Sequence, residues 1–312
     1  MPLPVLFQQR LEQIIPAPLR PKGDFSFKPK AYAAFRINTL KTGVSEVFDY
    51  LRAMPVEFEP MPWYPSGFWV PLGSHRAILD SPLGVEGKVY AQGAQSMIPV
   101  MALDPKPGER VLDLCAAPGS KTSQIAAHMQ NTGVLVANEP IRSRFYRLKA
   151  VLELTGAKAQ TTMVDGRRFR INGDNPLFDR VLVDAPCSSE GRFNVDDPKS
   201  VGYWSLRKIE EMAHKQKGLL LNASRLVKPG GVLVYATCTF APEENEEVLD
   251  WFLRKTDGAF EIAPLNFEGL LSYPALPAWG KRQFDAQTAH ALRICPTSHQ
   301  EGFFTAKIIR KH

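Results

Sequence analysis

Five apolar runs in the second part of the chain each predict a buried strand, because they are nearly continuous, rich in β-branched residues and bounded by Gly or Pro. Stretches with helical periodicity separate them. Strands are predicted at residues 110–115, 133–139, 159–165, 178–186 and 230–238, and helices at about 119–130, 141–156, 205–228 and 243–256. Strands that alternate with helices of this length form a parallel sheet with right-handed crossovers. The pattern therefore predicts an α/β, Rossmann-like fold, to which residues 302–310 add a strand, antiparallel and at or near an edge.

The first hundred residues have a different pattern, dense in prolines and aromatic residues. FRINTLK (35–41) predicts a strand, residues 44–54 a helix, and residues 63–70 one or two strands. Residues 88–104 predict an amphipathic bridge into the second part. We therefore expect two domains: an N-terminal α+β module with its bridge at 1–104, and an α/β domain at 105–312 that packs against it.

The composition is that of an ordinary globular protein. Of 312 residues, 44% are hydrophobic and 22% charged, which argues against disordered, collagen-like and coiled-coil classes. No run of 18 apolar residues predicts a membrane span, and the N-terminus lacks the basic start and apolar stretch of a secretory signal. The four cysteines have no zinc-ligand spacing. We therefore expect a cytoplasmic protein with free thiols, no metal and no membrane partner.

The positive charge is concentrated in one segment. The chain carries a net charge of +6, and residues 142–170 hold eight basic residues against two acidic ones, an excess of the same size. Such a run is either a solvated face or a stripe that contacts phosphates. A second candidate stripe lies in the N-terminal module. The two sets are Arg142, Arg144, Arg147, Lys149, Lys158, Arg167, Arg168 and Arg170, and Lys28, Lys30, Arg36 and Lys41.

The first predicted strand of the second part leads into a loop of small residues, DLCAAPGSKT (113–122). Ligands in open α/β sheets bind beyond the carboxyl ends of the strands, where small residues let the backbone approach. The loop has neither the dinucleotide-binding nor the phosphate-loop spacing of glycines. The next three strands end in Glu139, Asp165 and Asp184. Although each acid alone is typical of a cap or turn, together they indicate a pocket for a nucleoside, as in S-adenosyl-L-methionine.

Two cysteines occupy matching places after neighbouring strands, Cys187 in DAPCS and Cys238 in ATCT. A buried structural cysteine is the ordinary interpretation of either one. Two thiols at the carboxyl ends of adjacent strands point into one crevice, however, which favours chemistry. A thiolate that adds to C6 of a pyrimidine makes C5 nucleophilic enough to take a methyl group from a sulfonium donor. The spacing does not say which thiol attacks.

These motifs resemble those of the NOL1/NOP2/Sun family of RNA cytosine-C5 methyltransferases. The resemblance rests on DLCAAPGSKT, DAPCS, and TCT followed by PEENE (242–246). It extends to FRINTLK, YAQGAQSMIPV, Arg293 and GFF (302–304), and so covers about residues 30–309. The stretches PMPWYPSGFWV and NTGVLVANE are most similar to the bacterial small-subunit ribosomal RNA methyltransferase F branch.

The resemblance implies a role for each matched residue. Cys238 is the expected nucleophile, Cys187 the thiol that helps release the product, Asp184 the partner of the cytosine N3/N4 edge, and Lys121 a neighbour of the site. The cofactor S-adenosylmethionine is expected on the loop, with Glu139 at its ribose and Asp165 near its adenine. The expected cofactor-binding set is Cys115, Ala116, Ala117, Pro118, Gly119, Ser120, Lys121, Glu139, Asp165 and Asp184.

The chain departs from the family pattern at two positions. Ser120 replaces a second glycine, as in the F-like branch, and Ser189 replaces the usual glycine after Pro-Cys-Ser, which affects the loop expected to hold the target base. The expected product is 5-methylcytosine in RNA, with ribosomal RNA the first expectation and transfer RNA the second. The resemblance implies that the module at 1–104 binds RNA and that the domain at 105–312 is catalytic. The alternative is a non-catalytic RNA-binding or ribosome-assembly protein, which loss of Cys238 or of the Asp184 motif would have favoured; both are present. A protein or small-molecule methyltransferase would not need paired thiols.

Overall fold

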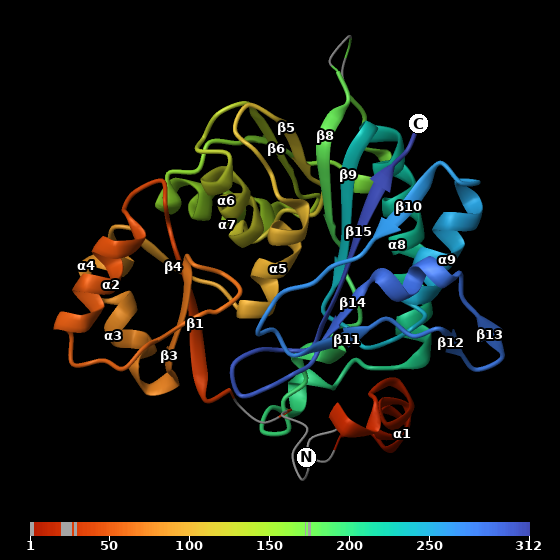
Figure 1. Cartoon of the computed structure of the whole chain (residues 1–312), viewed down its shortest axis with the longest axis horizontal. Helices are drawn as coiled ribbons and strands as arrows, with labels where there is room; N and C mark the ends of the chain where they lie inside the picture. The colour runs from red at the N-terminus through yellow and green to blue at the C-terminus, as the bar shows by residue number, and fades with distance from the viewer. Residues whose placement is uncertain (1–2, 20–26, 28–29, 172, 174–175) are drawn as a thin grey trace.

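The large sheet follows from the alternation of apolar runs and helices in the second part of the chain. The computed structural model describes residues 3–19, 27, 30–171, 173 and 176–312 (Figure 1). Within these ranges the sheet has the order β11-β14-β15-β9-β8-β5-β6-β7, with β10 beside β15. Its strands are β5 (Arg110–Asp113), β6 (Val134–Asn138), β7 (Gln160–Thr162), β8 (Phe178–Asp184), β9 (Val227–Thr237), β10 (Phe260–Ala263), β11 (Ser272–Pro274), β14 (Leu292–Ile294) and β15 (Phe303–Arg310).

The parallel half of this sheet contains the predicted Rossmann-like order. Strands β7, β6, β5, β8 and β9 run parallel, and the chain order reverses between β5 and β8. At such a switch point the loops after two adjacent strands diverge and leave a crevice. All five predicted strands and four predicted helices are confirmed, with boundaries shifted by a few residues. The helices are α6 (Ser120–His128), α7 (Arg142–Thr155), α8 (Leu206–Leu226) and α9 (Glu246–Lys255).

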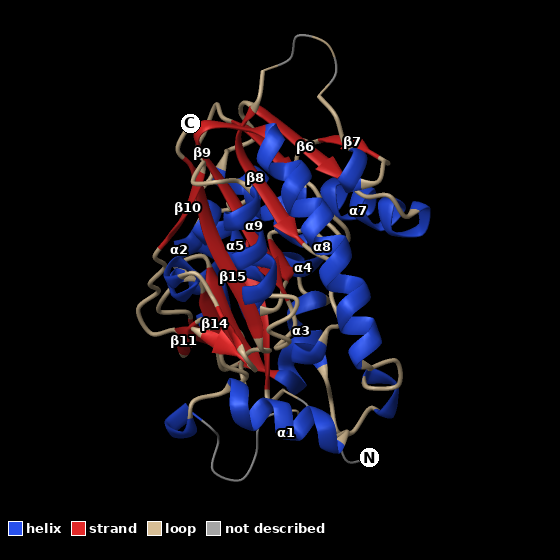
Figure 2. Ribbon diagram, turned by 90° about the vertical axis from the view of Figure 1, so that its right-hand side faces the viewer, coloured by secondary structure: helices blue, strands red, loops and turns tan. Residues whose placement is uncertain are grey.

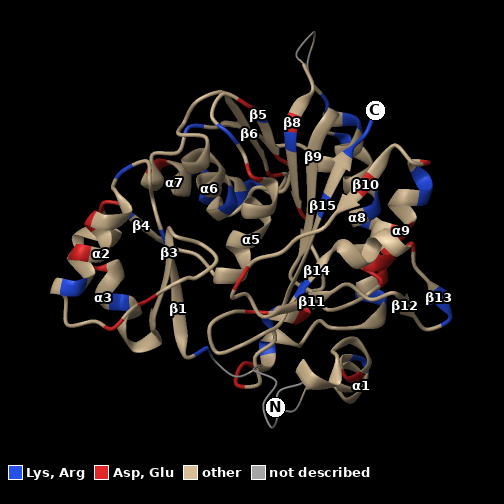
Figure 3. Ribbon diagram, in the orientation of Figure 1, with Lys and Arg blue, Asp and Glu red and all other residues tan. Residues whose placement is uncertain are grey.

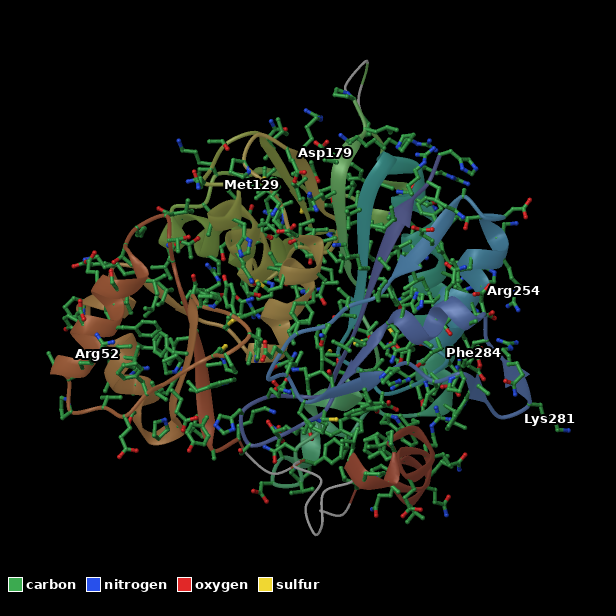
Figure 4. All side chains as sticks on the ribbon, viewed as in Figure 1. Arg52, Met129, Asp179, Arg254, Lys281 and Phe284 are labelled. Atoms are coloured by element: carbon green, nitrogen blue, oxygen red, sulfur yellow. The ribbon has the colours of Figure 1, made fainter. Side chains whose placement is uncertain are left out.

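Helices cover both faces of the parallel strands, as Figure 2 shows from the side. On β8, Val181 and Val183 pack in the core with α8 and α9, whereas Leu182 packs in the core with α5 (Ala94–Leu103), α6 and α7. Burial of both faces explains why the strand sequences are continuous apolar runs and do not alternate. Side chains fill the space between these layers, while those of Arg254 and Lys281 extend at the periphery (Figure 4).

The C-terminal strand β15 was predicted at or near an edge; it lies near an edge, one strand in from β10, and not at it. It is antiparallel, as predicted, but it pairs with β9 on one side and with β14 and β10 on the other. The intervening short strands β10, β11 and β14, which the sequence pattern does not predict, extend the sheet beyond it. A small hairpin, β12 (Ala278–Trp279) and β13 (Arg282–Gln283), lies outside the sheet.

The N-terminal module is built on a separate antiparallel sheet with the order β2-β3-β1-β4. The predicted strand at 35–41 begins earlier and ends at Ile37, because the following residues turn around the Asn38 side chain, which bonds to the backbone of Gly87 and Thr155. Residues 63–66 are a turn, so the stretch at 63–70 contributes one strand. The elements are α1 (Val5–Ile14), β1 (Tyr32–Ile37), α2 (Val44–Ala53), β2 (Glu59–Pro60), β3 (Gly67–Pro71), α3 (His75–Leu79), α4 (Pro82–Val85) and β4 (Val89–Ala91).

The predicted amphipathic bridge is a strand followed by a helix that is buried almost all round. Of the ten residues in α5, eight are buried, because the helix packs against α6 on one side and against the large sheet on the other. The expectation of a polar face is therefore wrong. The domain boundary at residue 104 stays a prediction. The helix α5 lies before this boundary in the sequence but packs against the sheet of the second part of the chain.

Short 3₁₀ helices occupy several loops. One of them, η3, follows β7 where the other parallel strands are followed by full helices. The 3₁₀ helices are η1 (Ala17–Leu19), η2 (Leu72–Ser74), η3 (Gly166–Arg168), η4 (Glu190–Arg192), η5 (Pro198–Ser200) and η6 (Ala286–His290).

Within the described ranges, no helix combines the length and apolar character needed to span a bilayer.

Candidate active site

The loop between β5 and α6 forms one wall of the crevice at the switch point. Gly119 precedes the first residue of α6 with a φ of 112°, and a Cβ at this position would lie 3.0 Å from Cβ of Val151 on α7. Both the backbone angle and the space favour glycine. Residues 115–118 and 120, on either side of this glycine, line the crevice.

An ion pair between a buried lysine and a partly exposed aspartate lies at the centre of the site. Lys121, in the first turn of α6, is 7% exposed, and its Nζ donates to Oδ2 of Asp184 and to Oγ of Ser96, at 2.7 Å each. Asp184 ends β8. Both residues were expected at the site from the sequence, and the structure adds Ser96 from α5 as the third member.

The two predicted thiols converge. Sγ of Cys187 lies 3.2 Å from Sγ of Cys238, and Oγ of Ser189 lies 3.6 Å from the latter sulfur. The cysteines follow β8 and β9, which are paired in parallel register up to Asp184 and Ala236. This register brings the two loops out at the same level and makes the thiols neighbours.

The environment distinguishes the thiols that border the crevice. The hydrogen bond shared with Cys187 lowers the pKa of Cys238, and the hydrogen bond with the Ser189 hydroxyl contributes to the same shift. The same bond to Cys238, together with burial, raises the pKa of Cys187 well above its ordinary value. Burial and the nearby Asp113 raise the pKa of Cys115 as well. Cys238 is therefore the thiol most easily converted to a thiolate nucleophile.

A cavity of about 500 Å³ connects the loop, the ion pair and the thiols. Most of the predicted site residues line it, so the structure brings the expected cofactor loop and the expected catalytic residues into one space. These lining residues are Cys115, Ala116, Ala117, Pro118, Ser120, Lys121, Asp184, Cys187 and Cys238.

Glu139 and Gly119 lie behind this lining. Glu139 is 1% exposed; its Oε1 accepts a hydrogen bond from the backbone of Ile141, and its Oε2 lies 3.4 Å from Nη1 of Arg144. Arg144 also donates to the carbonyl of Ala117 at 2.8 Å and lines the cavity. Arg144 thus links the acid at the end of β6 to the small-residue loop.

Asp165 does not line the cavity, and its carboxylate is bonded to Arg167. Its carboxylate caps η3 by accepting from the backbone of Arg167, and both of its oxygens accept from the Arg167 guanidinium, which lowers the pKa of Asp165. Its expected place near an adenine stays a prediction.

Asp113 is a site residue to which the sequence motifs assigned no role. It ends β5 beneath the loop, and burial raises its pKa to about 7 against the hydrogen bond from Thr122. Its Oδ1 is buried and accepts from no group in the described part of the chain. Its position at a strand end, like that of Asp184, is the signal that could have identified it.

Among the described residues no group of three or more His, Cys, Asp or Glu side chains could hold a metal ion.

Further lining residues come from motifs that had no assigned role. Gln95 and Ser96 belong to YAQGAQSMIPV, and Phe303 belongs to the closing GFF. Nε2 of Gln95 donates to Glu301 at 2.8 Å, and Arg192 lies 3.9 Å from the same carboxylate. These residues line the same cavity as the thiols and the ion pair.

The two candidate phosphate-contacting stripes have different outcomes. Arg144 and Arg167, as described above, are engaged with acids, whereas Arg142, Lys149 and Arg168 are exposed. Lys and Arg are spread over both parts of the molecule and are not confined to α7 (Figure 3).

The prediction that Arg36 belongs to a phosphate-contacting stripe is wrong. This residue is 0% exposed and donates to Oγ of Ser123, so it cannot reach a phosphate in the folded protein. Nζ of Lys41 donates to the backbone carbonyls of Glu86 and Leu154. Lys28 lies outside the described residues.

Comparison with known sequences identifies the family. The sequence model described as 16S rRNA methyltransferase RsmB/F matches residues 100–309. The chain belongs to the RsmB/F methyltransferase family. The resemblance to the NOL1/NOP2/Sun family and to its F branch is thereby confirmed, and the chain is an enzyme of the methyltransferase class.

Relatives of this RsmB/F family member differ in how much of their length it covers. A tRNA (cytosine(49)-C(5))-methyltransferase of Pyrococcus abyssi is 40% identical over 88% of this chain and 87% of that protein. The ribosomal RNA small subunit methyltransferase F of Serratia proteamaculans is 37% identical over 99% of this chain and 63% of that protein. The corresponding protein of an Escherichia coli strain is 38% identical over 88% and 56%. The chain therefore spans less than two thirds of these F methyltransferases.

Solved structures agree with the family assignment. A methyltransferase homolog protein from Pyrococcus horikoshii is 34% identical and superposes with a TM-score of 0.78 over 91% of this chain and 87% of that one. NSun6 from the same organism, solved with SFG, is 20% identical with a TM-score of 0.77 over 98% and 96%, and shows the same fold. The Rossmann-like methyltransferase fold is thus confirmed.

The departure at Ser189 has a geometric meaning in this RsmB/F chain. Ser189 has a φ of 62°, in the left-handed region that favours glycine. A glycine after Pro-Cys-Ser meets this backbone requirement without cost. Serine bears the strain and places its hydroxyl beside Cys238.

Proposed function

We propose that the chain methylates C5 of cytosine in RNA, with S-adenosylmethionine as the methyl donor and Cys238 as the nucleophile. The observation that carries this proposal is the pair of thiols 3.2 Å apart, bordering the same cavity as the Lys121–Asp184 ion pair. C5 of cytosine is a poor nucleophile unless a thiolate first adds to C6. Paired thiols meet that need, and methyl transfer to nitrogen or oxygen does not require them.

The residues at the cofactor end of the cavity fit S-adenosylmethionine. Asp113 lies at the end of β5, behind the loop that lines the cavity, and its buried Oδ1 has no side-chain hydrogen-bond partner among the described residues, which suits a polar ligand group on that loop. Cys115 to Lys121 would hold the cofactor through their backbone, Glu139 would accept from the ribose, and Asp165 would lie near the adenine. When bound, the cofactor supplies a methyl group activated on a sulfonium.

Attack on the base follows from the pKa difference between the thiols. The Cys238 thiolate would form a bond from Sγ to C6, and the electrons of the C5–C6 double bond would move into the ring and make C5 nucleophilic. Asp184 would hold the N3/N4 edge of the cytosine, while Lys121 fixes the position of the carboxylate. C5 would then take the methyl group.

Release requires loss of the C5 proton, after which the C6–S electron pair returns to Cys238. Once Cys238 is bonded to carbon, its negative charge no longer raises the pKa of Cys187. Cys187 would then take part in this proton removal, as the family resemblance implies.

Ribosomal RNA is the first candidate for the substrate class, supported by the family description and by the F relatives. Transfer RNA is the second, because the Pyrococcus abyssi relative is named as a tRNA enzyme and matches over most of both chains. A target cytosine in structured RNA must leave its stack, at roughly a few kcal/mol. Bisulfite sequencing of total RNA from cells with and without the gene distinguishes the two. A lost site in ribosomal RNA supports the first candidate, and a site lost only in transfer RNA replaces it with the second.

The substitution Cys238→Ala tests the proposed chemistry. It should reduce methyl transfer to background, because no other thiol at the site has a lowered pKa, and leave cofactor binding within about twofold. Tritiated-methyl transfer to RNA and calorimetric titration with S-adenosylmethionine measure the two effects. Substantial turnover by the variant would remove Cys238 as nucleophile and return that role to Cys187.

A further inference from the structure

The motif PEENE (242–246) has no part in the chemistry proposed above, yet its last three residues are fully buried. Glu244, Asn245 and Glu246 are each 0% exposed. Glu246 is paired with Arg293 at 2.6 Å. Within the described ranges no ion pair reaches the carboxylate of Glu244, so its burial needs another explanation.

Glu244 holds the peptide groups on both sides of Cys187. Its carboxylate accepts from the backbone nitrogen of Ser188, at 3.0 Å to Oε2, and from Nε2 of Gln216 at 2.7 Å. The same Gln216 nitrogen donates to the carbonyl of Pro186 at 2.9 Å. The residues before and after Cys187 are therefore fixed by one carboxylate and the amide that it binds.

Glu190 does the same for the segment after Cys238. Its Oε2 accepts from Oγ1 of Thr239 at 3.0 Å and from the backbone nitrogen of Phe240 at 3.1 Å. Its Oε1 accepts from the indole of Trp204 at 2.8 Å. Glu190 belongs to the loop of Cys187, whereas Glu244 follows Cys238 in the chain, so each carboxylate binds the segment that carries the other thiol.

Direct bonds join the same two segments. The hydroxyls of Ser188 and Thr239 lie 2.7 Å apart, and the backbone nitrogen of Gly191 donates to the carbonyl of Cys238 at 2.9 Å. Burial raises the pKa of Glu244 to about 8 and also raises that of Glu190. Two buried carboxylates are a poor source of stability compared with apolar residues, which points to a role in geometry.

We propose that Glu190 and Glu244 are positioning residues that form a reciprocal clamp and keep the Cys187 thiol within hydrogen-bonding distance of the Cys238 sulfur. The clamp rests on the proposed function only for the use of the two thiols. Its immediate effect is on the reactivity of Cys238, which can be measured without RNA or cofactor.

The experiment measures the rate at which iodoacetamide alkylates Cys238 in the full chain as a function of pH, by peptide mass spectrometry. Glu244→Leu removes the acceptor for Ser188 and should raise the apparent pKa of Cys238 toward that of an ordinary thiol. Because one pKa unit is a tenfold change in thiolate below both pKa values, the rate at pH 7 should fall about threefold to tenfold. Glu244→Gln keeps an oxygen acceptor and should stay within about twofold of the wild-type rate.

Two controls separate positioning from general damage. Glu247→Gln changes a nearby carboxylate whose hydrogen bond is to Arg282, and should leave the profile unchanged. In a Cys187→Ala background, Glu244→Leu should have no further effect, since the clamp acts through Cys187. An unchanged profile for Glu244→Leu, or an equal effect in both backgrounds, overturns the proposal.

If Glu244→Leu does not fold, Gln216→Leu removes the bond to Pro186 and is tested in the same way. Loss of the alkylation effect leaves the methyl-transfer result with Cys238→Ala unaffected, so the two failures are distinguishable.

Discussion

Ser189 combines an unfavourable backbone angle with a hydrogen bond to the proposed nucleophile, Cys238. A left-handed φ costs a non-glycine residue roughly 1–2 kcal/mol, and such strain persists where the surrounding structure imposes it. The hydroxyl lies 3.6 Å from Sγ of Cys238, and its hydrogen bond is one cause of the lowered pKa of that thiol. The residue thus combines a conformational cost with a favourable contact to the nucleophile.

The substitutions Ser189→Gly and Ser189→Ala separate these two contributions. Both remove the hydroxyl, but only glycine relieves the left-handed strain. Ser189→Gly should therefore be more stable than Ser189→Ala by about 1 kcal/mol, after allowing for the greater freedom of glycine in the unfolded chain. Urea unfolding measures the difference. Equal stability of the two variants, or a more stable alanine variant, contradicts the account of this position.

At the same scale, the convergence of Cys187 and Cys238 could be predicted from the sequence, because residues that follow adjacent parallel strands emerge at one edge. The opposite pKa shifts could not, since they depend on the direction of a single hydrogen bond. Asp165 shows a different limit. The sequence places it at a strand end, but its neighbour Arg167 occupies the carboxylate in the folded chain.

Helices and strands were predicted where the spacing of apolar residues is regular enough to distinguish one from the other. Five strands and four helices followed from apolar runs and helical spacing in the second part. The strands β10, β11 and β14 beyond β15 were not predicted, so the position of β15 inside the sheet did not follow from the sequence. The burial of α5 was missed because a helix packed against both α6 and the sheet need not be amphipathic.

The basic residues of α7 and η3 carry a prediction at this scale. Residues 142–170 hold eight cations, and those on the exposed surface include Arg142, Lys149 and Arg168. Replacing these three with Ala should weaken binding of different RNAs alike and leave cofactor affinity unchanged. The slope of log K against log salt should fall by roughly 0.7–0.9 for each phosphate that the variant no longer neutralises.

Filter binding of a short single-stranded RNA between about 50 and 200 mM salt measures this slope. A triple variant of Lys255, Lys281 and Lys311, three exposed lysines on other parts of the chain, is the matched control for charge and should keep the wild-type slope. If the α7 and η3 variant also keeps that slope, the segment is a solvated face and the RNA binds elsewhere on the protein.

For the molecule as a whole, the site is assembled from segments distant in the chain. Ser96, Lys121, Asp184, Cys238 and Phe303 border one cavity, although more than 200 positions separate the first from the last. The long-range β8–β9 pairing and the reversal of strand order at β5 make this possible. The sequence motifs predicted the fold and nine residues that line the cavity, but not Ser96 or Phe303. The hydrogen bonds of the buried carboxylates, which link the thiol segments, required the structure.

The central claim is that Cys238 bonds covalently to the target cytosine and that Cys187 acts in its release. The most direct test incubates Cys187→Ala with S-adenosylmethionine and labelled transcripts of 16S ribosomal RNA or transfer RNA, followed by a denaturing gel. The account predicts a retarded protein–RNA band for this variant and none for the double variant with Cys238→Ala. A clean gel for Cys187→Ala on an RNA that the wild type methylates, or a retarded band that persists in the double variant, would contradict it.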